Sequence, residues 1–358
     1  MNVQELNKYV IKKLEGNRKK DEAFIDYLSD LLADYQDQVK NLDFGTILEL
    51  QSGSIIDVVN GWCSGIIDSL NSYEEGNIVK AVEIIRQLFN QYAEQMSEFV
   101  INHEKNNIWY RMRTLEPYTR RYYAKDMFHV PFRKLGCLGN QRFSISGFPC
   151  LYLGNSVWSC WEEMHEPDMN NSCVSRIEAV GELKLLNLSW PVNDATVVDN
   201  IADYKAVCTW PLIIACSIRT LNPQDTFKPE YIIPQMVMMA IKTGSIYQGC
   251  TYTSTQRNDH FSWGYELLTN AAIPVMKIDH NYELCPELTS KFLVSDSTKG
   301  EYIQLEGEMS FVNFDDEVAC VTANGKYDNS VFGNIESYFG KNKLLAAKSL
   351  ESSYLHGK

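Results

Sequence analysis

The sequence lacks the short motifs by which several large enzyme classes are recognised. It contains no Gly-x-Gly-x-x-Gly, no Gly-x-x-x-x-Gly-Lys-Ser/Thr, no Gly-x-Ser-x-Gly and no His-Glu-x-x-His. These absences argue against a Rossmann dinucleotide site, a P-loop, an α/β-hydrolase elbow and a zincin. The ten cysteines include no Cys-x-x-Cys pair, and the six histidines do not cluster. We therefore expect no metal site, because no Cys/His group has the spacing of zinc ligands.

Basic charge and long apolar runs are also scarce. The 358 residues carry 46 acidic against 33 basic side chains, a formal charge of -13, which repels phosphate backbones. We expect neither nucleic-acid nor membrane binding, and we interpret the basic residues 12–20 as a solvated helix end. No run reaches ~18 apolar residues, and residues 1–6 show no signal-peptide pattern. Because several cysteines lie in apolar runs, as reduced thiols do, we expect a soluble, cytoplasmic protein.

Composition and periodicity predict an α+β protein with an N-terminal helical domain. Hydrophobic residues make up 45% of the chain, which is enough for a sizeable core. Residues 1–105 carry the 3.6-residue periodicity of helices. A dense aromatic, β-prone run at 108–113 then opens a second domain, residues 106–300, in which strands and helices alternate irregularly. Residues 301–358 are expected to form a C-terminal extension.

Caps and turn residues predict individual elements. Asp21 and Asn77 are expected to cap helices, the second with an apolar face reaching Phe99. A helical stretch at 195–206 is followed by another that Pro211 opens. A further helix is expected between residues 331 and 350. The strands predicted after the first domain cover residues 108–113, 150–153, 174–179, 183–188, 246–253, 302–305 and 318–322.

A strand–turn–helix stretch in the middle of the chain carries the first candidate for chemistry. The apolar run 150–153 predicts a buried strand, and Ser156 is the expected N-cap of a short helix. The apolar face of that helix consists of Val157, Cys160, Trp161 and Met164. Glu162 points away from this face, whereas Glu163 lies on its flank, where a side chain can border a pocket. On composition alone, two solvated glutamates are the commoner interpretation.

Two other polar residues stand out against apolar surroundings. Arg111 lies inside the aromatic run, where a charge is costly unless it is paired or bound to an anion. A structural salt bridge explains Arg111 equally well. Ser254 ends the strand predicted after Gly249, and a turn hydroxyl is its ordinary interpretation. Neither residue identifies a function alone.

Taken together, these positions resemble the RES domain family, which is named after an arginine, a glutamate and a serine. An arginine after an aromatic residue matches Arg111, with Arg113 as the alternative. The pattern Arg-aromatic-x-x-x-Gly-x-Pro-x-Leu-Tyr-Leu matches residues 142–153, which contain Arg142 and Tyr152, and the family's glutamate matches Glu163.

The last motif of the family also has a counterpart. Tyr-x-x-Pro-Gln, a helix and Gly-x-x-Tyr-x-Ser match Tyr231, Pro234, Gln235, Gly249, Tyr252 and Ser254. The resemblance spans roughly residues 108–275. The chain departs from the family at Met112, Ser144 and Thr253, positions that concern substrate contacts rather than the class of reaction.

The resemblance implies a fold similar to ADP-ribosyltransferase toxins and an enzyme that consumes NAD⁺ as substrate, not as cofactor. It assigns catalytic roles to Glu163, Arg111 and Ser254, and substrate binding to Tyr152, Arg142, Arg113 and Tyr252. The chemistry suits these side chains, since a carboxylate stabilises the oxocarbenium-like sugar and arginines hold a pyrophosphate. Family members are typically bacterial toxins paired with an Xre-type antitoxin.

Several alternatives stay open at this point. Water, inorganic phosphate or a macromolecule can accept the ADP-ribose, so the enzyme is a glycohydrolase, a phosphorylase or an ADP-ribosyltransferase. A different possibility is a non-catalytic interaction protein that uses its helical N-terminal region. Those helices must bury their apolar faces, which a homo-oligomer, a partner or the rest of the chain can provide.

Overall fold

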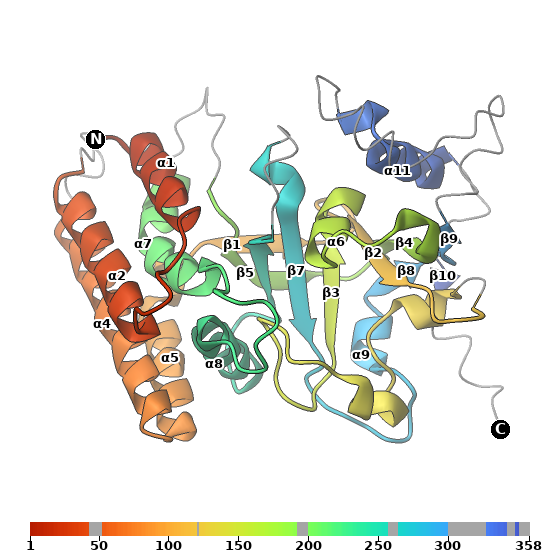
Figure 1. Cartoon of the computed structure of the whole chain (residues 1–358), viewed down its shortest axis with the longest axis horizontal. Helices are drawn as coiled ribbons and strands as arrows, with labels where there is room; N and C mark the ends of the chain where they lie inside the picture. Colours follow the sequence, from red (N-terminus) through yellow and green to blue (C-terminus); the bar gives the residue numbers. More distant parts are fainter. Residues whose placement is uncertain are drawn as a thin grey trace. The chain divides into compact units, whose positions relative to one another are not determined.

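The computed structural model describes residues 1–42, 52–119, 122–191, 200–256, 264–299, 327–341 and 348–350. The predicted α+β class is confirmed, because N-terminal helices are followed by a mixed sheet with interspersed helices (Figure 1). None of the helices in these ranges is both long and apolar enough to cross a bilayer. The strands predicted at 302–305 and 318–322 lie outside the described residues.

The internal contacts of the chain define two compact units. Unit 1 comprises Met1–Phe99, Gly139–Ser146 and Lys184–Thr255, and unit 2 comprises Val100–Leu138, Gly147–Leu183 and Gln256–Lys358. The units interleave along the sequence and are defined by contacts alone, so they do not test the predicted boundaries at residues 105 and 300. The predicted division into three domains therefore stays a prediction.

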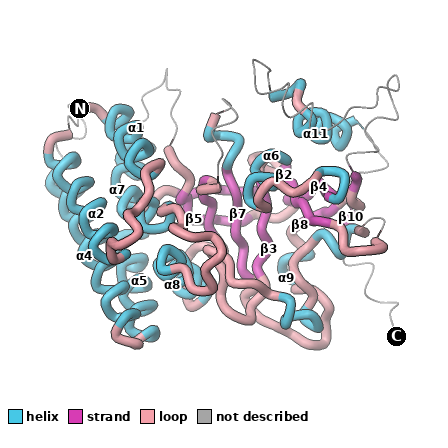
Figure 2. Tube along the Cα trace, viewed as in Figure 1, coloured by secondary structure: helices cyan, strands magenta, loops and turns pink. Residues whose placement is uncertain are grey.

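Unit 1 consists mainly of helices that pack on one another. They are α1 (Val3–Leu14), α2 (Phe24–Lys40), α4 (Ser52–Glu74), α5 (Ile78–Tyr92), α7 (Asn200–Ser217) and α8 (Ile232–Lys242), with the 3-10 turns η2 (Ala93–Gln95) and η6 (Pro229–Tyr231). Helix α4 contacts α2, α5 and α7, and α5 contacts α8; Figure 2 shows these helices in cyan. Strand β5 (Leu183–Leu188) pairs in parallel with β6 (Cys250–Thr253). The N-terminal helices thus bury their apolar faces against α7 and α8, which come from later in the chain.

Two capping predictions have different outcomes. The Asn77 side chain accepts a hydrogen bond from the Lys80 amide at 3.1 Å, so it caps α5 as predicted. Asp21 does not cap α2, because that helix begins at Phe24 and Ala23 occupies the cap position without a side-chain bond. Helix α5 also ends earlier than predicted, since a 3-10 turn intervenes and Phe99 lies in β1 (Glu98–Ile101).

Close packing accounts for Gly61 in the middle of α4. A Cβ atom at Gly61 would lie 2.2 Å from the hydroxyl oxygen of Tyr92 on α5. Glycine at this position leaves room for the Tyr92 side chain, which offsets its lower helix propensity. Helix α4 runs without a break from Ser52 to Glu74, through Gly61 and Gly65.

Helix α7 corrects the prediction that Pro211 opens a new helix. Pro211 lies inside a single helix, where it lacks the amide that would bond the Val207 carbonyl. The buried Tyr35 hydroxyl of α2 donates to that carbonyl at 2.7 Å. A side chain from another helix thus satisfies the acceptor that proline leaves open. Residues 195–199 of the other predicted helical stretch lie outside the described residues.

Unit 2 is built on an antiparallel sheet with the strand order β7-β3-β2-β4-β8-β10, in which β9 also pairs with β4. The strands are β2 (Ile108–Thr114), β3 (Cys150–Gly154), β4 (Ser172–Ala179), β7 (Thr269–Pro274), β8 (Phe292–Val294), β9 (Thr298–Lys299) and β10 (Lys348–Ser349). The predicted strands at 108–113, 150–153, 174–179 and 183–188 are confirmed, whereas the strand predicted at 246–253 is restricted to β6.

Two helices pack together on one face of this sheet. They are α6 (Val157–Glu163) and α11 (Val331–Lys341), and Figure 1 shows them as neighbours. The helix expected between residues 331 and 350 is thus confirmed as α11. The buried cluster that joins α6, α11 and the sheet contains Tyr110, Met112, Val157, Trp158, Cys160, Trp161, Met169, Val174, Leu268, Phe332, Ile335 and Phe339.

Candidate functional site

Helix α6 holds Glu163 in its last turn, and both of its ends are fixed. The Ser156 side chain accepts from the Ser159 amide at 2.9 Å, which confirms the predicted N-cap. Strand β3 ends at Gly154, where a Cβ atom would lie 2.2 Å from the Ser159 hydroxyl. Glycine at this position lets the helix pass close to the sheet.

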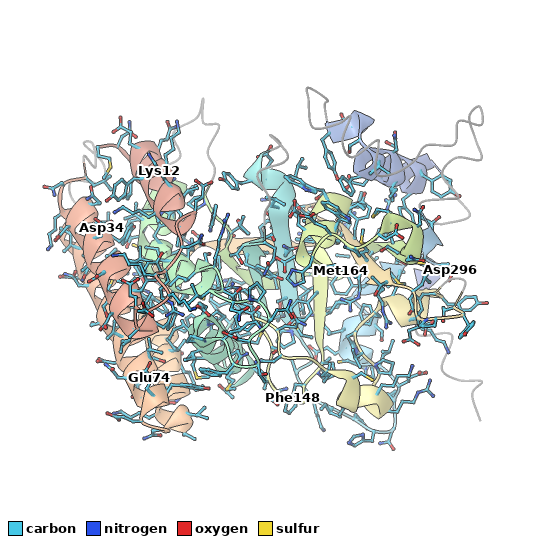
Figure 3. The ribbon with its side chains drawn as sticks, in the orientation of Figure 1. Lys12, Asp34, Glu74, Phe148, Met164 and Asp296 are labelled. Carbon is cyan, nitrogen blue, oxygen red and sulfur yellow. The ribbon has the colours of Figure 1, made fainter. Side chains whose placement is uncertain are left out.

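The C-terminal end of α6 has an uncommon backbone. Met164, labelled in Figure 3, is the C-cap, and His165 and Glu166 follow with φ of 59° and 55°. Their amides donate to the carbonyls of Glu162 and Trp161, each at 3.0 Å, which is the bonding pattern of a Schellman motif. Non-glycine residues rarely adopt such φ values, so the chain stores strain directly after Glu163.

The prediction that Glu162 points away from the packed surface is wrong. Glu162 is 1% exposed, and its Oε1 accepts from the Trp158 indole nitrogen at 2.8 Å. The reason is tertiary, because β2, β3, β7, η7 (Tyr265–Leu268) and α11 all contact this seven-residue helix. A single apolar face does not describe a helix that is covered from several directions.

Glu163 is the partly exposed glutamate of the pair, whereas the sequence prediction made Glu162 the one that points away from the packed face. Its Oε1 accepts from the Asn270 side-chain amide at 3.3 Å. Asn270 is 3% exposed and lies on β7 opposite Gly154 of β3. The sequence prediction missed Asn270, although an amide inside the apolar strand Thr269–Pro274 is a signal that could have identified it.

The hydrogen-bonded pairing between strands β2 and β3 ends beside Arg111. Strand β2 pairs with β4 along its whole length, but the defined register with β3 consists of one pair, Tyr110 opposite Gly154. Beyond that pair, the Arg111 Nη1 donates to the Tyr152 carbonyl at 2.7 Å. The arginine therefore supplies a donor to a strand carbonyl at the position where the two strands stop pairing.

Arg111 is a desolvated cation. Burial, followed by the neighbouring charge of Arg113, lowers the pKa of Arg111 to about 10, so the guanidinium stays protonated at neutral pH. Within the described ranges no carboxylate forms an ion pair with either arginine. Arg113 donates to the Asp126 carbonyl at 2.6 Å and lies 4.6 Å from the Tyr122 ring centroid. Two cations on one strand that pair with no carboxylate of the described residues are suited to bind an anionic ligand.

The thiols near α6 are unreactive. Burial is the main cause that raises the pKa of Cys150 and of Cys160 to about 12. A protonated, buried thiol is a poor nucleophile. The carboxylate of Glu163 is therefore a better candidate for chemistry than either cysteine.

The other predicted site residues belong to unit 1. Arg142 is 8% exposed and donates to the Cys216 carbonyl at 3.2 Å and to the Thr255 hydroxyl at 3.1 Å. Its guanidinium lies 5.0 Å from the Tyr231 ring centroid. Gln235 donates to the Gln141 carbonyl at 3.1 Å. The start of the motif at residues 142–153 and the motif that contains Tyr231 and Gln235 are therefore in contact within unit 1.

Tyr252 and Ser254 are buried in the same unit. The Tyr252 ring packs on Phe143 with centroids 4.6 Å apart, and Ser254, immediately after β6, is 2% exposed. Arg111, Arg113, Tyr152 and Glu163 thus belong to unit 2, where Arg111 contacts the Tyr152 backbone, and Arg142, Tyr252 and Ser254 belong to unit 1. Convergence of the two sets on one substrate stays a prediction.

Comparison with known proteins points to toxins. The chain is 33% identical over 273 residues to a protein named "Putative toxin YopC" from Bacillus subtilis (strain 168). The similar region is 70% of this chain and 61% of that protein, so the chain spans less than two thirds of its relative's length. No family profile and no solved structure matches the chain. The predicted similarity to toxins is therefore supported, while the RES resemblance and the use of NAD⁺ stay predictions.

Proposed function

We propose that the chain is a toxin that breaks the bond between nicotinamide and ribose in NAD⁺. The toxin role is supported by the name of the relative, and the NAD⁺ substrate by the RES resemblance. The observation that carries the proposal is the environment of Glu163, a partly exposed carboxylate at the end of a firmly packed helix, held by the Asn270 amide.

The proposed reaction needs one well-placed negative charge. When the glycosidic bond breaks, its electron pair goes to the ring nitrogen, which neutralises nicotinamide and leaves positive charge on the ribose. The Glu163 carboxylate stabilises that charge until an oxygen nucleophile bonds to the anomeric carbon and loses its proton. Arg111 and Arg113 supply the cations that the pyrophosphate requires.

The remaining predicted contacts complete this proposal. Tyr152 lies on β3 beside Arg111 and would stack on the nicotinamide ring or hold the ribose. The substrate roles of Arg142, Tyr252 and Ser254, with the Ser254 hydroxyl bonding the amide or a ribose hydroxyl, are proposed from the resemblance alone. An Xre-type antitoxin as partner is likewise proposed from the resemblance alone.

Nicotinamide release from NAD⁺ by the purified full-length chain tests the proposal. We expect Glu163→Gln to lower the rate at least ~100-fold, because it removes the charge and keeps the shape. Glu182→Gln, at an exposed position of the same unit, is the control and is expected to keep wild-type activity. Absence of nicotinamide release by the wild type would overturn the proposal.

The products of the same assay identify the acceptor. Free ADP-ribose indicates hydrolysis, and a phosphorylated ADP-ribose formed only with inorganic phosphate indicates phosphorolysis. A stoichiometric label on a macromolecule, with little free ADP-ribose, would instead establish a transferase.

A further inference from the structure

Helix α6 cannot hold Glu163 in place on its own. It has seven residues, fewer than the ~12–15 that an isolated helix needs to be marginally stable in water. Its orientation must therefore come from the elements that pack against it.

One of these elements, α11, comes from the C-terminal part of the chain. Its residues Phe332, Ile335 and Phe339 are 1%, 0% and 2% exposed. The Phe332 ring lies 5.3 Å from Trp161 of α6, centroid to centroid, and the Phe339 carbonyl accepts from the Arg176 guanidinium of β4 at 3.2 Å. Helix α11 thus packs against α6 and is hydrogen-bonded to the sheet of unit 2.

A specific polar contact joins the two helices. The Glu336 Oε1 of α11 accepts from the Val157 amide, the first residue of α6, at 2.7 Å. The Tyr327 hydroxyl, in the turn η9 (Tyr327–Asn329), donates to the same oxygen. A carboxylate at this place satisfies an amide that has no partner within the helix and interacts favourably with the helix dipole.

We propose that α11 is a clamp for the glutamate-bearing helix, and that Glu336 is a positioning residue for Glu163. The inference rests on the proposed NAD⁺ cleavage. Glu336 acts through the N-terminus of α6, whereas Glu163 lies at the other end of the same short helix. A shift of α6 therefore moves the Glu163 carboxylate relative to the sugar.

Steady-state kinetics of three full-length variants test this role. Glu336→Ala removes the acceptor, and we expect kcat to fall about 10-fold with the KM for NAD⁺ within about 2-fold of wild type, since binding groups on the sheet are untouched. Glu336→Gln keeps an oxygen acceptor and is expected to restore most of kcat. Ser337→Ala, an exposed neighbour on α11, is the control. An unchanged kcat of folded Glu336→Ala would refute the proposal, as would a change confined to KM.

Hydrogen exchange gives a readout that does not depend on the reaction. We expect the amides of α6 to exchange faster in Glu336→Ala than in Ser337→Ala, while those of β4 stay protected in both. Unchanged exchange in α6 would refute the clamp. If the wild type released no nicotinamide but α6 exchanged faster in Glu336→Ala, the clamp would stand and the proposed reaction would fail.

Discussion

Partly buried arginines have different partners in the two units. In unit 1, Arg18 pairs with Glu230 at 3.0 Å, and their side chains are 9% and 2% exposed. This pair contradicts the interpretation of residues 12–20 as a solvated helix end, at least for Arg18. In unit 2, Arg111 donates to a backbone carbonyl and has no carboxylate partner among the described residues. Arg18 therefore forms a structural ion pair, whereas the binding of an anionic ligand by Arg111 stays a proposal.

Breaking the pair in unit 1 should have the largest effect on stability. Arg18→Met leaves Glu230 buried without its cation, which costs about 3–5 kcal/mol of unfolding free energy. Arg111→Met leaves behind no carboxylate that is paired with it among the described residues, so it should cost clearly less stability, and we expect it to lower the proposed NAD⁺ cleavage. Urea unfolding followed by tryptophan fluorescence measures both, with Arg86→Met at an exposed ion pair as the control that should not change. Equal losses for Arg18→Met and Arg111→Met would remove the distinction between the units.

A buried histidine should make unit 2 sensitive to acid. Burial, helped by the charge of Arg111, lowers the pKa of His129 to about 4 from an ordinary value of 6.5. Its Nε2 accepts from the Cys285 amide at 2.9 Å, which requires the neutral ring. As pH falls from about 6.5 to 4, the unfolded state takes up a proton that the folded state refuses, so roughly 3 kcal/mol of stability is lost.

The pH dependence of urea unfolding tests the His129 prediction. The stability of His129→Gln should fall less steeply between pH 6.5 and 4 than that of the wild type, although the variant is less stable at pH 7.5. Parallel curves for the two proteins would show that another group is responsible.

The contribution of the Tyr35 hydroxyl to the stability of unit 1 should be smaller than that of the Arg18–Glu230 pair. Tyr35→Phe leaves the Val207 carbonyl buried without a donor and should cost ~1–3 kcal/mol. In a Pro211→Ala background the helix regains its own amide donor, so the same substitution should cost about 1 kcal/mol less. Additive effects in this double-mutant cycle of thermal unfolding would contradict our account of α7.

Relief of the backbone strain at His165 should produce the smallest change in the free energy of unfolding. His165 has a φ of 59°, which glycine adopts without steric cost. His165→Gly is expected to raise the unfolding free energy by up to about 1 kcal/mol, an increase that thermal unfolding can detect. A loss of stability would show that the His165 side chain makes contacts that outweigh the strain.

The sequence was sufficient to predict elements that depend on neighbouring residues, such as a strand marked by an apolar run or a helix marked by its N-cap. The strand before Gly154 and the helix capped by Ser156 follow from an apolar run and an N-cap, and both formed as predicted. Pro211 and Glu162 were misjudged because distant residues decide their environments, a tyrosine from α2 for the first and the several elements packed around α6 for the second. The Asn270 amide was missed because its partner Glu163 lies far away in sequence.

The most direct test of the central claim is nicotinamide release from NAD⁺ by the wild-type chain and by Glu163→Gln, measured side by side on folded protein. Our account predicts release by the wild type and at least ~100-fold slower release by the variant. Equal rates for the two proteins would show that the carboxylate at position 163 does not act on the sugar, and would contradict the account.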